Sequence, residues 1–132
     1  MKRHQAYQLH AEGQTIWVKP NGILTMRSAQ EYQHELKQLA QPIVGKPWAM
    51  VMDLTCWQPS PLPVVDILKQ VSSWCFAHQL THVALILPPD PLLTWQYLKA
   101  TDVAKPADFV RYQVANVQEA RQVLADAGFL QL

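Results

Sequence analysis

The sequence predicts an α/β fold, with a single mixed, mostly parallel sheet of four to five strands and helices on both faces. Three observations support this prediction. After an opening hairpin, short apolar runs alternate with amphipathic helix-like segments up to the C-terminus. The apolar runs are continuous rather than alternating, which is typical of parallel strands covered on both faces. The connections are too short to hold a second domain, so we expect one domain over residues 1–132, with residues 1–6 as a flexible tail.

The opening hairpin is predicted over residues 7–11 and 15–19, because polar and apolar residues alternate on either side of a turn at Gly13. A helix should follow. Its start is indicated by a capping box over residues 28–31, in which serine and glutamate can satisfy each other's backbone N–H groups. Apolar residues then recur at intervals of three and four, and Pro42 ends the pattern.

The remaining elements alternate strand and helix. Residues 48–54 are apolar except for Asp53 and predict a central buried strand. Ser60 and Pro61 indicate the next helix start, with serine as the N-cap and proline at the first helical position. The same signals predict strands over 82–87 and 109–114 and helices that begin at Asp90 and Asn116, the last one ended by Gly128.

Composition limits the function classes. The chain is 49% hydrophobic with a formal net charge of +1, and no clustered basic stripe is present, so we expect no nucleic-acid partner. The longest apolar run is too short to span a bilayer, so no stable membrane insertion is expected. Without a signal peptide pattern or metal-ligand spacing of Cys56 and Cys75, the chain should be cytoplasmic with free thiols. Low charge also allows a homodimer.

The order of these elements, with several short motifs, resembles the STAS domain, which is named for sulfate transporters and anti-sigma factor antagonists. The motifs are residues 17–25 ahead of the first helix, the buried strand over 50–54, and Phe109, Val110, Glu119, Ala120 and Leu124 near the end. Within this superfamily, the chain is most similar to the SpoIIAA-like group of uncharacterised bacterial proteins. The resemblance implies a non-enzymatic domain that binds a regulatory partner or, since this group is similar to lipid-binding Sec14-type folds, a small lipid-like apolar ligand.

The chain departs from the family at the phosphorylation switch. Phosphorylated anti-sigma factor antagonists carry an Asp-Ser-Ser/Thr-Gly turn after the central strand. Residues 55–63 read TCWQPSPLP here, so Leu62 and Pro63 stand where the phosphoacceptor and its neighbour would be. The switch is therefore not carried over. A phosphorylation-switched antagonist that uses Ser60 or Thr55 remains an alternative interpretation.

Asp53 supports a second alternative, a small hydrolase or transferase that uses this carboxylate with a hydroxyl such as that of Thr55. No second acid, nucleophile motif, glycine-rich phosphate loop or third ligand for His78 and His82 accompanies it. We therefore favour a domain that is not an enzyme and needs no cofactor or metal. In that interpretation Asp53 organises its loop by accepting backbone hydrogen bonds.

Tryptophans supply the remaining signal. Trp57 follows the central strand and Trp95 lies in the helix after the next strand, so both should lie beyond the carboxyl ends of neighbouring parallel strands. Open α/β sheets bind their ligands at this edge. We predict an apolar groove for a ligand or partner, formed by six residues of the two connections: Trp57, Pro59, Leu62, Pro89, Leu92 and Trp95. The alternative is that both indoles simply cover the ends of the core.

Overall fold

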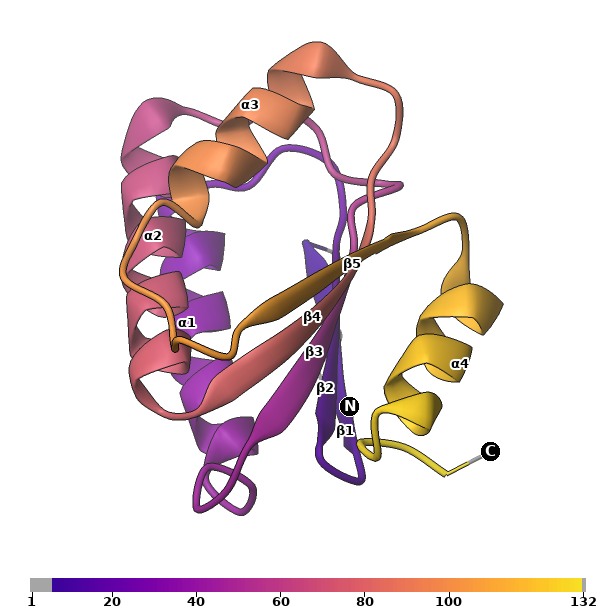
Figure 1. The fold of residues 1–132 in the computed structure, drawn as a ribbon. Helices are drawn as coiled ribbons and strands as arrows, with labels where there is room; N and C mark the ends of the chain where they lie inside the picture. Colours follow the sequence, from indigo (N-terminus) through magenta and orange to yellow (C-terminus); the bar gives the residue numbers. More distant parts are fainter. Residues whose placement is uncertain (1–5, 132) are drawn as a thin grey trace, which may run out of the picture.

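The computed structural model describes residues 6–131, which form one five-stranded sheet in the order β1-β2-β3-β4-β5 (Figure 1). β1 is antiparallel to β2, and every other neighbouring pair is parallel. The strands are β1 (Tyr7–Glu12), β2 (Thr15–Pro20), β3 (Trp48–Asp53), β4 (Leu80–Ile86) and β5 (Val110–Val114). The helices are α1 (Met26–Ala40), α2 (Leu62–Ala77), α3 (Pro91–Ala100) and α4 (Val117–Asp126).

Helices cover both faces of the sheet, as the sequence predicts. α1, α2 and α3 lie together on one face, which we call the α1–α3 face, and α4 lies on the other, the α4 face (Figure 1). α2 packs between α1 and α3. The predicted fold class, a mixed and mostly parallel sheet with an antiparallel first strand, is therefore confirmed. Within residues 6–131, no helix combines the length and apolar character needed to cross a membrane.

Two helices begin where the sequence predicts, because their N-caps are made locally. The Asp90 carboxylate accepts hydrogen bonds from the backbone N–H groups of Leu92 and Leu93. The Asn116 side chain accepts one from the N–H of Glu119. These bonds satisfy N–H groups that have no partner within the helix itself.

The predicted start of α1 is wrong by several residues. The capping box pairs Thr25 with Ser28, not Ser28 with Glu31. The Ser28 backbone N–H donates to the Thr25 hydroxyl oxygen at 3.1 Å, and the Thr25 backbone N–H donates to Ser28 Oγ at 2.8 Å. Ser28 is thus the third helical residue rather than the cap.

The predicted cap of α2 is also wrong. The helix begins at Leu62, its N-cap is Pro61, and no side chain caps it. Ser60 lies one residue further out and bonds to other segments of the chain. At the other end of α2, Gln79 adopts a left-handed conformation (φ 75°), and β4 starts directly after it, two residues before the predicted start.

Ala6 is the one residue of the flexible tail predicted for residues 1–6 that the structure describes. Its carbonyl accepts a hydrogen bond of 2.8 Å from the N–H of Asn21, which ties it to the end of β2. Residues 1–5 lie outside the described part of the chain. At the C-terminus, Gly128 ends α4 in the left-handed conformation (φ 93°), as predicted.

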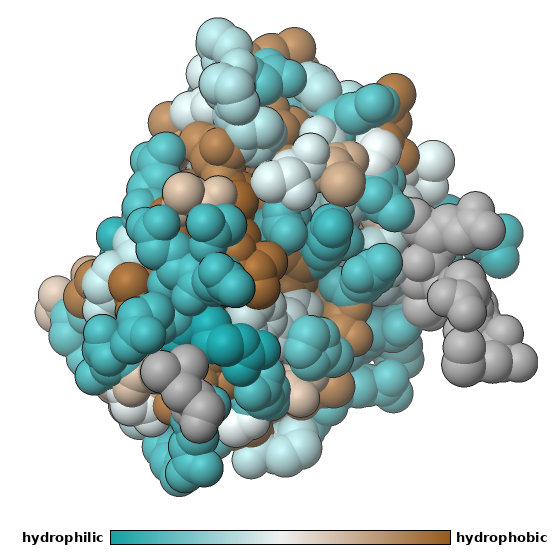
Figure 2. All heavy atoms as spheres, turned by 90° about the vertical axis from the view of Figure 1, so that its right-hand side faces the viewer, coloured by the Kyte–Doolittle hydropathy of each residue, from teal (hydrophilic) through white to brown (hydrophobic). Residues whose placement is uncertain are grey.

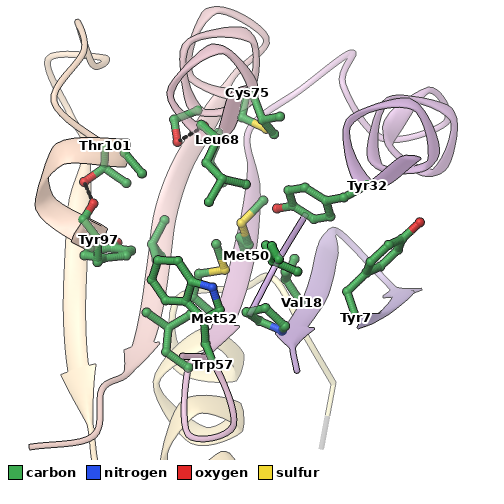
Figure 3. Close-up of a pocket in the computed structure, with 18 of the residues that line it drawn as sticks. Tyr7, Val18, Tyr32, Met50, Met52, Trp57, Leu68, Cys75, Tyr97 and Thr101 are labelled. Atoms are coloured by element: carbon green, nitrogen blue, oxygen red, sulfur yellow. Dashed lines mark hydrogen bonds between the residues drawn. The ribbon is translucent and has the colours of Figure 1, made fainter. Parts of the chain in front are cut away.

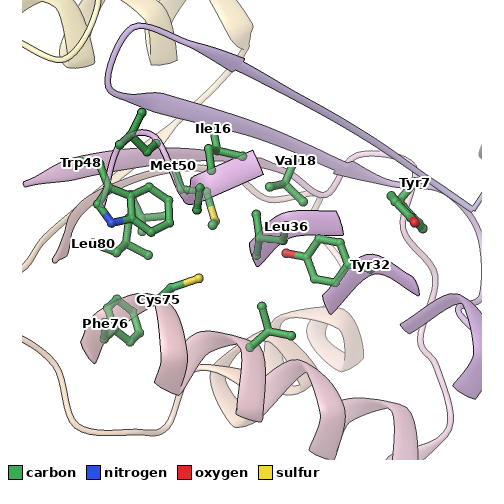
Figure 4. Packing of buried hydrophobic residues seen from close by; sticks show 14 residues of the cluster. Tyr7, Ile16, Val18, Tyr32, Leu36, Trp48, Met50, Cys75, Phe76 and Leu80 are labelled. Atoms are coloured by element: carbon green, nitrogen blue, oxygen red, sulfur yellow. The ribbon is translucent and has the colours of Figure 1, made fainter. Parts of the chain in front are cut away.

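The core lies on both sides of the sheet, because strand side chains alternate between its faces. On β3, Met50 and Met52 point to the α1–α3 face, and Ala49 and Val51 point to the α4 face. Figure 4 shows sheet residues such as Ile16 and Met50 facing residues of α1 and α2, among them Leu36, Cys75 and Phe76. The α4 side of the molecule, seen in Figure 2, has hydrophilic side chains around a strip of apolar ones.

Candidate functional site

An apolar pocket lies between the sheet and the helices of the α1–α3 face (Figure 3). The space free of protein atoms, including the part open to solvent, measures about 740 Å³, and about 60 Å³ of it forms a cavity large enough for water-sized molecules. The residues that define it are Val18, Met50 and Met52 from the sheet, Tyr32, Leu68 and Cys75 from α1 and α2, Tyr97 from α3, and Trp57 from the loop after β3.

Polar atoms are scarce around this pocket, and two of them have no partner among the described residues. The indole Nε1–H of Trp57 is buried without a hydrogen bond. The Tyr32 side chain is only 5% exposed, and the protein offers its hydroxyl no hydrogen bond within residues 6–131. Figure 3 shows the Tyr32 hydroxyl pointing toward Met50, and the Trp57 indole approaching Met52 from the opposite side.

The ionisable groups at the pocket stay neutral. Burial raises the pKa of the Tyr32 phenol well above its ordinary value, and raises that of the Cys75 thiol to about 12. Charged forms are disfavoured because the pocket offers no solvation. Among the lining residues that the structure describes, none is Lys, Arg, His, Asp or Glu. Tyr7 at the margin donates its phenol hydrogen to Glu35, a bond that also raises the Tyr7 pKa after the larger effect of burial.

Ser60, Gln96 and Leu24 form a hydrogen-bonded network beyond the carboxyl ends of the strands, which we call the clasp. The Gln96 side chain accepts from the Ser60 backbone N–H at 2.8 Å and donates to the Ser60 carbonyl at 2.7 Å. Ser60 Oγ accepts from the Leu24 N–H at 3.0 Å and donates to the Gln58 carbonyl. The clasp therefore joins α3, the loop before α2 and the loop before α1. With Ser60 only 6% exposed, a kinase would have to open these bonds to reach it.

The six residues predicted to form one groove do not together line the apolar pocket. Trp57 is 6% exposed and lines the pocket, and the other five do not line it. Trp95 is 45% exposed, and its ring lies under the Lys99 ammonium at 5.5 Å. Leu62, Leu92 and Pro89 are exposed and Pro59 is half-buried.

Helix periodicity explains the separation of the two indoles. Leu93 and Tyr97 of α3 pack with Trp57 in one buried cluster. Trp95 lies two residues from each of them, so it is rotated by about 200° and points away from the sheet. As predicted, both tryptophans lie in segments that follow the carboxyl end of a parallel strand, Trp57 after β3 and Trp95 after β4. Their rings, however, lie on opposite sides of α3.

Asp53 lies at the carboxyl end of β3 and bonds to its own loop. Its Oδ1 accepts from the backbone N–H of Thr55 at 3.1 Å and from the Thr55 hydroxyl at 2.6 Å. Within the described residues, no group of three or more His, Cys, Asp or Glu side chains could hold a metal ion. The geometry around Asp53 is that of a loop-organising turn.

Four residues that line the pocket were not among the site residues predicted from the sequence: Tyr32, Met50, Met52 and Tyr97. All four fall on apolar stripes that also mark an ordinary core, and no local pattern distinguishes a residue beside a cavity from one in close packing. The one available signal was the pair of methionines, because flexible thioether side chains are common at adaptable binding surfaces.

The fold and the pocket define a class, an α/β domain with an interior apolar site. No protein-family model and no curated protein matches the chain. Seven chains of solved structure are similar to it, among them those of two different proteins. The first is an uncharacterized protein from the DUF3478 family with a SpoIIAA-like fold, from Shewanella loihica PV-4, with 15% identity and a TM-score of 0.65 over 94% of this chain and 98% of that chain.

The second similar structure is the crystal structure of Mglu, with 15% identity and a TM-score of 0.53 over 64% of this chain. The alignment spans 20% of the Mglu chain. Similarity at this level of identity establishes the fold, and the fold of this chain is SpoIIAA-like. The SpoIIAA-like fold predicted from short motifs is therefore confirmed.

Proposed function

We propose that this chain is a non-enzymatic, cytoplasmic domain that binds a small apolar ligand between the sheet and the helices of the α1–α3 face. The observation that carries the proposal is the apolar pocket around Trp57 and Met50. Small-molecule sites are typically concave and apolar, with a few polar groups that fix orientation. This pocket has both features.

Energetics also favour an occupant. Leaving a cavity of about 60 Å³ empty costs roughly 1.4 kcal/mol at the usual penalty per unit of cavity volume. An apolar molecule that fills the cavity recovers this free energy and buries its own surface. Met50 and Met52 line the pocket, and their unbranched side chains can change rotamer to fit a larger ligand.

The direct test is extraction of the purified protein with organic solvent, followed by mass spectrometry of the extract. We expect an apolar compound that co-purifies with the protein. In parallel, the fluorescent probe N-phenyl-1-naphthylamine should bind to protein freed of this compound, with increased emission, and the extract should displace it.

A matched pair of variants locates the binding. Val71 lines the pocket from α2, and Ser73 is exposed on the same helix. Val71→Phe should abolish probe binding by filling the cavity, whereas Ser73→Phe should leave it unchanged. Circular dichroism confirms that both variants fold. Equal probe binding by the wild type and a folded Val71→Phe variant, with no extracted compound, would show that the pocket is not a ligand site.

Docking of a regulatory protein is a second candidate function, supported by an exposed apolar row on α3. Leu92, Trp95 and Leu98 are each about half exposed, and a row of this kind often marks an interface. A second copy of the chain is the simplest partner. Sedimentation should then show a dimer that Trp95→Glu disrupts, with ligand binding unchanged; a monomer at all concentrations would remove the homodimer version.

A further inference from the structure

The polar groups of the pocket specify the chemistry of its ligand. Trp57 Nε1–H is a donor only and has no partner, although the residue is 94% buried. A buried donor without a hydrogen bond is rare, because it has lost water without gaining a replacement. The Tyr32 hydroxyl, on the other side of the pocket, is a second group with no hydrogen bond inside residues 6–131.

An unpaired indole alone would not indicate a ligand, as Trp17 on the α4 face shows. Its Nε1 is also buried without a partner. The Trp17 ring, however, is covered by stacking with His10 at 5.7 Å and by the Arg121 guanidinium at 4.9 Å, and it does not line the pocket. Trp57 differs because its ring borders open space that also contains an unpaired hydroxyl.

Charge is the second constraint. A carboxylate, phosphate or ammonium in this pocket would need an opposite charge beside it, because burial of an unpaired ion is strongly unfavourable. The described lining residues supply none. Tyr32 cannot serve as an anion, since burial holds its pKa far above the neutral range. The site therefore favours an uncharged molecule.

We propose that the pocket binds an uncharged apolar carbonyl compound, whose oxygen accepts a hydrogen bond from Trp57 Nε1. This inference rests on the proposed apolar-ligand function and adds the headgroup chemistry. A hydrocarbon chain occupies the space beside Met50 and Met52. A free fatty acid in its ionised form is disfavoured, because none of the described lining residues is a cation.

Three probes of equal chain length test the headgroup: 2-octanone, octanoate and octane, each titrated at pH 7 and followed by calorimetry and tryptophan emission. Because water solvates the ketone carbonyl and not octane, the informative quantity is the ratio of the 2-octanone affinity to the octane affinity. This ratio should be about tenfold higher for the wild type than for Trp57→Phe, which corresponds to one hydrogen bond with a previously unpaired donor. Octanoate should bind more weakly than either 2-octanone or octane. In ¹H–¹⁵N spectra of the wild type, 2-octanone should shift the Trp57 indole resonance downfield, and octane should not.

Conservative variants separate the hydrogen bond from the shape of the pocket. Trp57→Phe should lower the affinity for 2-octanone relative to octane and leave octane binding nearly unchanged. Trp95→Phe, on the outer side of α3, should keep the wild-type ratio of the two affinities. If either Phe variant fails to fold, the indole resonance of the wild type still decides the question.

The outcomes distinguish the two proposals. If 2-octanone, octane and the extracted compound all fail to bind, the proposed function itself is wrong. If Trp57→Phe leaves the ratio of the 2-octanone affinity to the octane affinity unchanged, or octanoate binds most tightly, the pocket is a ligand site but the uncharged carbonyl assignment is overturned.

Discussion

The two faces of the sheet differ in the size of the side chains that the central strands present to them. Toward α4, β3 and β4 present Ala49, Val51, Ala84 and Ile86, which pack with Ala120 and Leu124 of that helix. Toward α1, α2 and α3, the same strands present Met50, Met52, Val83 and Leu85. Small residues allow a helix to approach closely, whereas long flexible ones hold the helices further away. The pocket is lined from the second face.

This difference shows that burial and close packing are separate properties. The core clusters of both faces are made of residues that are largely withdrawn from water. Only measurement of packing tolerance can separate them, because a tight core loses stability when a side chain grows, whereas a core beside a cavity can accept it. The following predictions test the contrast, in order of expected effect.

The largest effect is expected for truncation on the α4 face. Leu124→Ala should reduce the free energy of unfolding by about 3 kcal/mol, because this fully buried leucine packs in the α4 cluster. Leu68→Ala, at a half-buried residue that already borders the pocket, should cost about 1 kcal/mol. Urea denaturation measures both, and equal losses would contradict the packing contrast.

Enlargement of a buried side chain should again destabilise the α4 face more than the pocket. Ala84→Val on the α4 face should cost about 1–3 kcal/mol, as overpacking does in a close-packed core. Val71→Ile at the pocket should be neutral or should stabilise by up to about 1 kcal/mol, because the added methylene enters existing space. Thermal melts of the two variants give the comparison. A large loss for Val71→Ile would mean that the cavity cannot accept even one additional methylene.

A fall in pH should lower the free energy of unfolding through His82, which lies on the α4 face. His82 lies against Phe129 at 4.6 Å, and burial lowers its pKa from 6.5, with a smaller opposing effect of Asp108. The unfolded chain therefore binds more protons, so this contribution to stability is complete above about pH 6.5 and falls as the pH drops toward the folded-state pKa. His82→Gln should flatten the stability profile between pH 5 and 7. An unchanged profile would assign the acid sensitivity to another group.

The smallest effect is expected for the ion pair that joins α4 to the hairpin. Arg121 donates to both carboxylate oxygens of Glu12 at 2.8 and 3.0 Å, and these hydrogen bonds lower the Glu12 pKa. Both side chains are about one-third exposed, so a double-mutant cycle should give less than about 1 kcal/mol, reduced further by salt. The contribution should be present above about pH 4.5 and lost as the pH falls through the lowered pKa. A value of several kcal/mol would show that water does not screen the pair.

Local interactions explain which element boundaries the sequence could predict. Asp90 and Asn116 cap helices through backbone groups two or three residues away, so the signal lies within a few letters of sequence. Ser60 occupies a similar position in the sequence, but its hydroxyl and backbone bond to Leu24 and Gln96, each 36 residues distant. No local rule could distinguish these two uses of a polar side chain before a proline.

The sequence by itself determined the architecture: the order of strands and helices, the antiparallel first strand, and the arrival of Trp57 and Trp95 at the same edge of the sheet. Apolar periodicity and turn chemistry are properties of short segments, and they suffice for this. The tertiary structure alone decided that the two indoles lie on opposite sides of α3, and that space remains beside Met50. A gap in packing is set by the separation of whole layers, which depends on contacts between residues far apart in the chain.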